Sequence, residues 1–303
     1  MNELNKEIHK KNVIQSKINN LALCGGGIYG YAEIGAMSEL EKYSEYIDIN
    51  TISGTSVGSI VAALYAVGYD IDSLIKIIFE MDFNKLICDT WIPYINVFFK
   101  YGMYNADGLE AEIERLITKK THIKNCTFSQ IKINLKIVTT NLNYQRAEIF
   151  DKISTPMMII SKAVRMSISF PFTITPSLWN GDLYGDGGEF VNYPIILFEN
   201  LEQTIGIAFA SYNENKDGTL RNRIPINSIF DLIKSTGTTM TRATYVSQIT
   251  QKYLDRSIII HISKDINSMQ FNLTKEQKQF ILECGIEAVK KQINYIVNID
   301  DNS

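Results

Sequence analysis

The chain of 303 residues lacks the features that mark several large classes of protein. Its four cysteines are scattered without C-x-x-C spacing, which argues against a structural zinc site and a dense disulfide framework. The formal net charge is -3, and no run of Lys and Arg is long enough to follow a phosphate backbone. We therefore expect reduced thiols, no bound metal and no nucleic-acid partner.

Long apolar runs are missing as well. No stretch approaches the roughly 18 uncharged apolar residues that a membrane-spanning helix needs. The first 20 residues lack the continuous apolar core of a secretory signal. We expect neither a transmembrane segment nor a signal peptide, and a cytoplasmic protein that meets membranes only peripherally.

Histidine is scarce, with only three in the chain. His9 lies in the polar N-terminal arm, His122 follows a predicted helix, and His261 lies inside the apolar run SIIIHIS. None occupies a turn at a strand end, where the histidine base of a serine hydrolase is expected. A serine nucleophile in this chain would therefore need a carboxylate as its base.

Two successive units of strand, glycine-rich turn and helix follow residue 20. The apolar run LALC leads into the turn GGGIYG and a helix predicted over 31–43. The β-rich run IDINTIS leads in the same way into GTSVG and an apolar helix that ends at Gly68. Because consecutive β-loop-α units build parallel sheets, the chain is predicted to have an α/β fold.

The chain divides at its polar segments. Residues 1–19 are predicted to be a polar N-terminal arm, 20–212 the main domain, and 213–303 a C-terminal helical extension packed on it. The boundary lies in the polar stretch 213–226. Further elements are predicted as helices near 72–80, 108–117, 154–166, 227–251 and 274–296, and as strands in INLKIVTTNL, TIGIAFA and SIIIHIS. Asp107 is expected to cap its helix, and Thr274 and Gln277 have the spacing of a capping box.

The strongest local signal is the G-x-S-x-G sequence from Gly54 to Gly58, with Ser56 at its centre. It lies between a β-rich run and an apolar helix, which is the context that the nucleophile turn requires. A serine at such a turn has an exposed hydroxyl, and the helix start favours developing negative charge. The alternative is that Ser56 merely caps its helix.

The turn GGGIYG allows two interpretations. Gly25, Gly27 and Gly30 match the G-x-G-x-x-G pattern of dinucleotide sites. Such a site needs an acidic residue at the end of the second strand, but that strand runs into Gly54 and Ser56. We therefore favour an oxyanion hole, in which backbone N–H groups converge on a carbonyl oxygen as it becomes anionic.

Asp186 is the candidate base. It precedes Gly187 and Gly188, which let the backbone approach another loop closely. An ordinary aspartate has a pKa near 3.9, so it accepts a proton from an alcohol poorly unless burial raises its basicity. Catalysis with this base should depend heavily on the oxyanion hole.

The motifs GGGIYG, GTSVG and DGG, in that order, resemble the patatin-like phospholipase family. The segments TFSQIKINLKIVTTNLNYQRAEIFD, AVRMSISFPF and DGGEFVNYP also look like family segments, and the resemblance spans roughly residues 18–292. It implies a three-layer α/β/α sandwich around a mostly parallel central sheet. It also implies a Ser-Asp dyad without histidine that hydrolyses esters of phospholipids, galactolipids or neutral glycerolipids, with no metal or other cofactor.

The resemblance assigns roles to matching residues. Ser56 is the expected nucleophile and Asp186 the proton acceptor, in a dyad that forms an acyl-enzyme. The oxyanion hole is expected from Gly25, Gly26 and Gly27, and the supporting motif residues are Gly30, Gly54, Gly58, Gly187 and Gly188. Many members have Arg or Lys just before the last glycine of the first motif, whereas this chain has Tyr29, which removes cationic help for a phosphate headgroup there.

The expected partner is a phospholipid or other glycerolipid at a membrane surface. Some relatives act after delivery into another cell, which is a second possibility for location. The rival functions are a catalytically weak or silent lipid-binding or acyl-transfer protein on the same fold, and a nucleotide-binding enzyme that uses the glycine loop. The missing ribose carboxylate argues against the nucleotide enzyme.

An aromatic segment interrupted by Pro93 is predicted to be a long loop or cap. It either forms an interfacial lid, since Trp and Tyr favour the lipid headgroup region, or covers the cleft and packs into the core. Its aromatic and apolar residues are Phe83, Trp91, Ile92, Tyr94, Phe98, Phe99, Tyr101 and Tyr104.

Overall fold

The computed structural model describes residues 17–87, 93–210, 225–262 and 266–297. Its central feature is an eight-stranded sheet in the order β10-β9-β1-β2-β4-β8-β7, with β5 paired to β4. The neighbours from β10 to β4 run parallel, and β5, β7 and β8 add antiparallel pairs at the other edge. The strands are β1 (Ile18–Leu23), β2 (Ile47–Thr55), β4 (Asn134–Asn141), β5 (Arg146–Asp151), β7 (Ser177–Trp179), β8 (Asp182–Asp186), β9 (Thr204–Phe209) and β10 (Ser257–Ile260).

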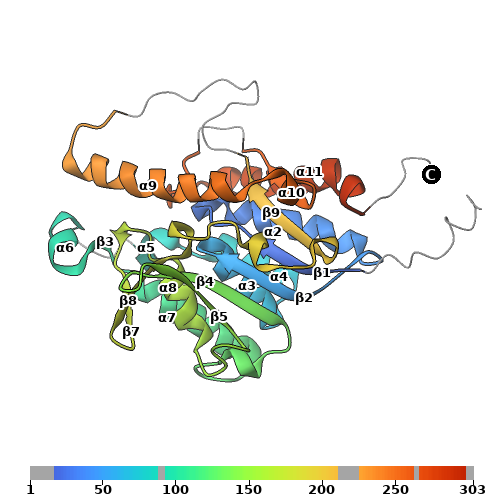
Figure 1. Ribbon diagram of the computed structural model, residues 1–303, viewed down its shortest axis with the longest axis horizontal. Coiled ribbons are helices and arrows are strands. Elements are labelled where there is room, and N and C mark those ends of the chain that lie inside the picture. Colours follow the sequence, from blue (N-terminus) through green and yellow to red (C-terminus); the bar gives the residue numbers. More distant parts are fainter. Residues whose placement is uncertain (1–16, 88–92, 211–224, 263–265, 298–303) are drawn as a thin grey trace, which may run out of the picture.

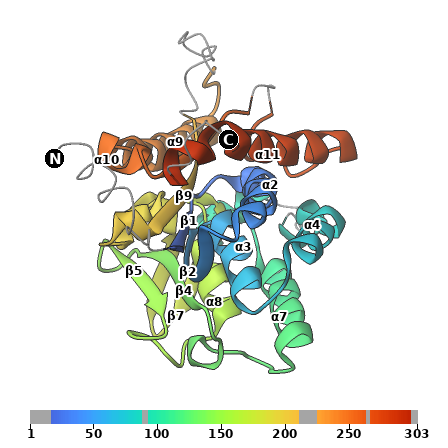
Figure 2. The same cartoon turned by 90° about the vertical axis from the view of Figure 1, so that its right-hand side faces the viewer.

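Helices flank this sheet, as the end-on view in Figure 2 shows. The α-helices are α2 (Gly30–Leu40), α3 (Val57–Ala66), α4 (Ile71–Glu80), α5 (Phe83–Ile87), α6 (Pro93–Lys100), α7 (Asp107–Thr121), α8 (Ile160–Ser167), α9 (Ile229–Gln248), α10 (Gln251–Leu254) and α11 (Lys275–Val297). Helices α3 and α8 pack on β2 and β4, while the 3-10 turns η5 (Pro194–Leu197) and η6 (Leu201–Gln203) pack on β1. Helices α9 to α11 run across the β9–β10 side (Figure 1). The predicted α/β/α fold around a mostly parallel sheet is confirmed.

The C-terminal segment joins this architecture directly. Strand β10 extends the sheet beside β9, and α11 packs along α2. The capping box predicted at the start of α11 is confirmed: Thr274 N–H donates to Gln277 Oε1 at 2.9 Å, and Gln277 N–H donates to Thr274 Oγ1 at 3.2 Å. The division into 20–212 and an extension of 213–303 stays a prediction.

The aromatic segment differs from the predicted loop. Asp82 Oδ1 accepts the Lys85 N–H at 3.1 Å and starts α5, which buries Phe83 and Ile87 on one face. Pro93 begins α6 instead of breaking a chain segment, because proline fits the first turn of a helix. Beyond α6, the short strand β3 (Gly102–Tyr104) pairs with β6 (Phe172–Ile174) in a separate sheet. Trp91 and Ile92 lie outside the described residues.

Two helix starts also differ from the prediction. Helix α8 begins at Ile160 because Asp151 holds the preceding residues in a turn, with its Oδ1 accepting the N–H groups of Ile153 and Ser154. Ala106 is the N-cap of α7, and Asp107 is its first residue. The Asp107 carboxylate accepts from Arg165 Nε at 3.3 Å instead of capping the helix.

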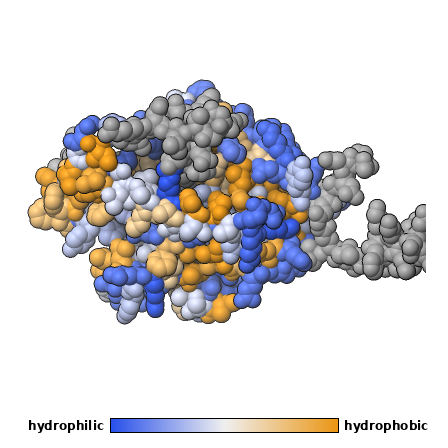
Figure 3. Space-filling view, turned by 45° about the horizontal axis from the view of Figure 1, so that its top comes forward, coloured by the Kyte–Doolittle hydropathy of each residue, from blue (hydrophilic) through white to orange (hydrophobic). Residues whose placement is uncertain are grey.

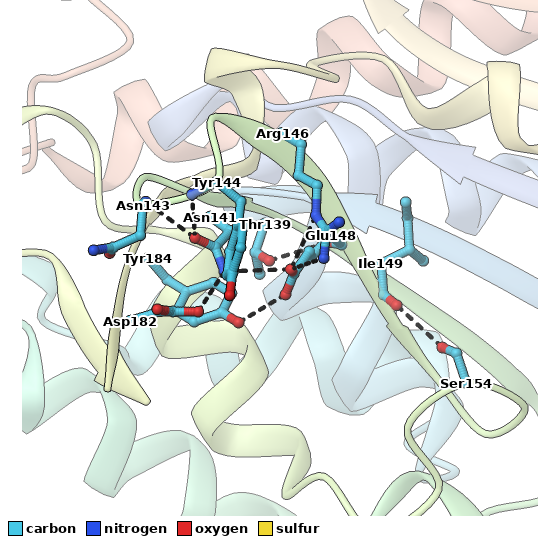
Figure 4. Close-up of polar contacts among 10 residues, drawn as sticks. All are labelled: Thr139, Asn141, Asn143, Tyr144, Arg146, Glu148, Ile149, Ser154, Asp182 and Tyr184. Atoms are coloured by element: carbon cyan, nitrogen blue, oxygen red, sulfur yellow. Dashed lines mark hydrogen bonds and ion pairs between the residues drawn. The ribbon is translucent and has the colours of Figure 1, made fainter. Parts of the chain in front are cut away.

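A polar network ties β8 to the β4–β5 hairpin (Figure 4). Asn141 Nδ2 donates to Asp182 Oδ2 at 3.0 Å and to Glu148 Oε1 at 3.3 Å. The Tyr184 hydroxyl donates to Glu148 Oε2 at 2.7 Å, and Arg146 forms an ion pair with Glu148 at 2.9 Å. The network joins side chains of three strands, so it stabilises the register in which β8 pairs with β4.

Candidate active site

Ser56 occupies a strained turn between β2 and α3. Its backbone has φ 53° and ψ -125°, which is rare for a residue with a side chain and is characteristic of a nucleophile turn. The Ser56 N–H donates to Ser167 Oγ at 2.9 Å, and the Ser167 hydroxyl donates to Val138 O at 2.6 Å. These bonds hold the turn against α8 and β4 and leave the half-buried Ser56 side chain at the cavity.

Close backbone packing explains the two glycines of this turn. A Cβ atom on Gly54 would lie 2.3 Å from Gly58 O, and one on Gly58 would lie 2.8 Å from Leu23 O. Neither site has room for a side chain unless the backbone moves. The turn is therefore built by residues close to Ser56 in sequence, packed against the end of β1.

Strand β4 brings Asp186 beside the turn. Thr55, at the end of β2, pairs with Val138, and Asp186, at the end of β8, pairs with the next residue, Thr139. Strands β2 and β8 thus meet end to end along one edge of β4. Ser56, which follows Thr55, and Asp186 are 130 positions apart in sequence, and the paired strands bring them to neighbouring points of the sheet.

The Asp186 carboxyl lies in a nearly dry environment. It is 2% exposed, Oδ1 accepts the Gly188 N–H at 2.7 Å, and Oδ2 has no hydrogen-bond partner among the described residues. Burial raises the pKa of Asp186 to about 7, opposed by the neighbouring Ser56 hydroxyl and by the Gly188 N–H. This aspartate is therefore a much better proton acceptor than an exposed one.

A second, half-buried carboxyl, that of Glu189, lies three residues further along. Burial, and then the charge of Asp186, raise the pKa of Glu189 to about 8. Glu189 Oε1 is buried without a hydrogen-bond partner among the described residues. The neutral form of Glu189 spares the site a second buried negative charge near neutral pH.

The glycine loop after β1 faces the same cavity, but its three glycines differ. The Gly25 N–H donates to Asn192 O at 2.9 Å, so this donor is already used. The N–H groups of Gly26 and Gly27 have no acceptor within the described part of the chain. Gly27 has φ 56°, and a Cβ atom there would lie 2.2 Å from Ser268 O, so only glycine fits.

Helix α9 holds the loop that follows Asp186, a role that no sequence motif indicated. Thr244 Oγ1 donates to Glu189 O at 3.2 Å, and Gln248 Nε2 donates to Phe190 O at 3.0 Å. Gln248 Oε1 also accepts the Tyr193 N–H at 2.9 Å. Both partners are more than 50 residues from the loop, so local sequence patterns could not reveal them.

A cavity of about 460 Å³ contains Ser56, Asp186 and the glycine loop. One group of lining residues is apolar and comes from α3, α4, α5, α7 and the residues after α8: Ile60, Ile78, Phe83, Ile87, Leu109, Ile168, Phe170 and Ile174. The side formed by α9 and the segment before α11 is mixed: its polar residues are Thr238, Thr241, Arg242, Asn267 and Ser268, and they lie among Tyr245, Ile266, Met269 and Phe271. The cavity thus suits an amphiphilic ligand with an apolar chain and a polar end.

Histidine takes no part in this cavity among the residues that the structure describes. His122 is exposed at the end of α7, His261 is exposed just after β10, and His9 lies outside the described residues. The described residues hold no group of three or more His, Cys, Asp or Glu side chains arranged for a metal ion. Within the same residues, no helix is both long enough and apolar enough to cross a bilayer.

Comparison with known proteins links this geometry to a family. The family model described as patatin-like phospholipase matches residues 21–198, which include the glycine loop, the Ser56 turn and Asp186. The uncharacterized protein R571 of Acanthamoeba polyphaga mimivirus is 60% identical over 95% of this chain and 98% of its own length. The probable lipid hydrolase 463L of Invertebrate iridescent virus 6 is 28% identical over 58% of this chain and 61% of its own length.

Solved structures show the same fold. VipD from Legionella pneumophila matches 93% of this chain and 67% of its own chain with a TM-score of 0.60 at 17% sequence identity. Since it covers 93% of the chain, this match extends beyond the range of the family model.

Proposed function

Because the chain belongs to the patatin-like phospholipase family, we propose that it is a serine lipid acyl hydrolase that cleaves fatty-acyl esters of glycerolipids. Ser56 is the nucleophile and Asp186 the general base of this proposal. The observation that supports it is the end-to-end meeting of β2 and β8 on β4: a strained serine follows one strand, a buried carboxyl ends the other, and both line one cavity. The name of the iridescent virus relative, a probable lipid hydrolase, agrees with it.

The first half of the reaction forms an acyl-enzyme. Ser56 Oγ attacks the ester carbonyl carbon and its proton passes to Asp186, whose raised pKa favours acceptance. The oxygen that becomes anionic is met by the N–H groups of Gly26 and Gly27, each worth about 10²- to 10³-fold in rate. Gly25 then serves a different role from the one predicted, since its N–H holds the Asn192 loop.

The second half releases the fatty acid. The alcohol portion of the lipid takes the proton from Asp186 and leaves, and a water molecule then gives its proton to Asp186 and attacks the acyl-enzyme. Collapse of the second tetrahedral intermediate returns the proton to Ser56. The apolar residues of the cavity hold the acyl chain, while the α9 side with Arg242 faces the glycerol and headgroup.

The decisive experiment measures fatty-acid release from vesicles that contain phospholipid and diacylglycerol, together with labelling by a fluorophosphonate. Wild-type protein should release fatty acid and be labelled at Ser56, whereas Ser56→Ala should do neither. Ser129→Ala removes an exposed serine outside the cavity and should behave as wild type. Undiminished release by folded Ser56→Ala protein would refute the mechanism.

A further inference from the structure

Large apolar side chains are exposed at one end of the molecule, on α6 and beside it. This apolar tip comprises Ile95, Phe98 and Phe99 of α6, Tyr101 just after it, and Phe172 of β6. Phe98 and Phe99 leave 73% and 80% of their surface exposed. Helix α6 lies at the left extreme of Figure 1, and Figure 3 shows hydrophobic residues gathered at that end. Soluble proteins rarely expose so many large apolar side chains together without a partner.

The start of α9 adds to this surface. Ile229 and Leu232 are exposed on its first turn, at the same end of the molecule in Figure 1. Helix α9 also packs on β6, the strand that carries Phe172. The exposed apolar side chains therefore belong to a set of connected elements and are not scattered over the surface.

The inner side of the tip is well anchored. Asn96 of α6 is buried, and its Nδ2 donates to Met103 O at 3.3 Å. β3 then pairs with β6, and the Thr175 N–H donates to Tyr104 O at 2.9 Å. The outer side chains are thus exposed because the inner face of the helix is already occupied, and not because α6 lacks a place to pack.

Two elements of this exposed surface, β6 and α9, also contribute to the walls of the cavity. Ile174 of β6, Phe170 just before it and Thr238 of α9 line the cavity, while the neighbouring Phe172 and the first turn of α9 face outward. A surface that covered the outward side chains would lie directly beside the cavity that takes the lipid.

We infer that the apolar tip inserts into the interfacial layer of a lipid bilayer and holds the cavity against the membrane. The inference rests on the proposed function, because a lipid hydrolase must draw its substrate from a bilayer. Phe and Tyr are suited to the interface, and a protruding helix with an apolar outer face can lie in it. The tip exposes five large apolar side chains and, at the end of α6, the single charge of Lys100, so we expect insertion to be driven mainly by apolar burial.

The test is co-sedimentation with phosphatidylcholine vesicles at low and high salt. The double variant Phe98→Ser/Phe99→Ser should bind roughly tenfold or more weakly than wild type, because two exposed aromatic rings are lost. Tyr295→Ser, which removes an aromatic residue 82% exposed near the end of α11, should bind as wild type. Wild-type binding should persist at high salt. Equal loss in both variants, or no loss in the double variant, would overturn the inference.

Hydrolysis of a water-soluble short-chain ester separates this inference from the proposed function. The double variant should hydrolyse the soluble ester at the wild-type rate but vesicle lipid at least tenfold more slowly, and Ser56→Ala should bind vesicles without hydrolysing either. If wild type hydrolyses the ester but does not bind vesicles, membrane insertion of the tip is refuted and the proposed function stands. If it binds vesicles but hydrolyses neither substrate, the proposed function is refuted and membrane insertion stands. A wild-type dimer that the double variant dissociates, with vesicle binding unchanged, would identify the tip as a subunit interface instead.

Discussion

The two halves of the proposed dyad are held in place by different means. The Ser56 turn takes its shape mainly from its own neighbours, since Gly54 packs against Gly58 and the strain is confined to one residue, while one long-range bond from the Ser56 N–H to Ser167 Oγ adds support. The Asp186 loop is held by distant parts of the chain: Thr140 Oγ1 donates to Asp186 O at 2.8 Å, and Gln248 of α9 bridges the following residues. The shape of the nucleophile turn is therefore largely local, whereas the position of the base depends more heavily on the assembled tertiary structure.

The sharpest way to test this contrast is to remove the buried charge. We expect Asp186→Asn to lower kcat/KM by about 10³-fold or more, because the amide cannot accept the serine proton. Since folding raises the pKa of Asp186, its stabilising contribution is present below about pH 4 and is lost as the pH rises toward 7. The variant should therefore be more stable than wild type at pH 8, by up to about 4 kcal/mol, with the difference shrinking toward pH 4. Denaturant unfolding at both pH values checks this, and a pH-independent difference would contradict it.

A change on the serine side should act through backbone geometry. We expect Gly27→Ala to reduce kcat by about 10²-fold, because the new Cβ displaces the loop from Ser268 and moves an oxyanion donor. Gly181→Ala is the matched control, since Gly181 also has a positive φ, of 90°, but no atom lies within 4 Å of the added Cβ. Steady-state kinetics on a soluble ester should show a loss only for Gly27→Ala; similar losses in both variants would point to general strain.

The pH dependence should report the environment of the base. We expect kcat/KM on a soluble ester to fall about tenfold per pH unit below an apparent pKa near 7, since Asp186 must be ionised to accept a proton. Rates measured between pH 5 and 9, with unfolding monitored by circular dichroism, check this. If kcat/KM instead falls only below about pH 4, water reaches Asp186 and burial does not raise its pKa.

The smallest effect is expected from removing the contacts by which Gln248 of α9 holds the Asp186 loop. Gln248→Leu should lower kcat by about tenfold with little change in KM, since it frees the loop between Asp186 and Tyr193 without touching the cavity. Greater access of water to Asp186 should also lower its pKa, so the acid-side fall of kcat/KM should move to lower pH. Loss of stability alone would not cause that shift. The control is Gln251→Leu on α10, whose exposed side chain donates from Nε2 to Asp255 Oδ1 at 2.7 Å, away from the loop. If the acid-side fall of kcat/KM occurs at the same pH in Gln248→Leu as in wild type, α9 does not position the base.

Much of the fold could be predicted because its signals are local. The alternation of apolar runs with the turns at Gly25–Gly30 and Gly54–Gly58 indicated strand, loop and helix in turn, and these units form the parallel part of the sheet. The capping box at Thr274 likewise depends on residues three apart, and it forms as predicted.

The remainder depends on contacts that no short pattern records. The engagement of the Gly25 N–H by Asn192, and the hold of α9 on the Asp186 loop, each join residues separated by more than 50 positions. The prediction of a loop in the aromatic segment was wrong for a related reason. A proline such as Pro93 is equally compatible with an irregular loop and with the first turn of a helix. Only the packed neighbours decide between these outcomes.

Strand β4 sets the spacing between the two halves of the proposed dyad. Because Thr55 and Asp186 are set opposite the adjacent residues Val138 and Thr139, loops elsewhere can lengthen or shorten without changing the spacing between nucleophile and base. A single residue inserted between Val138 and Thr139 would instead add about 3.3 Å and turn the following side chains to the opposite face. The tolerance of this enzyme family to insertion should therefore be high around the sheet and lowest at the middle of this one strand.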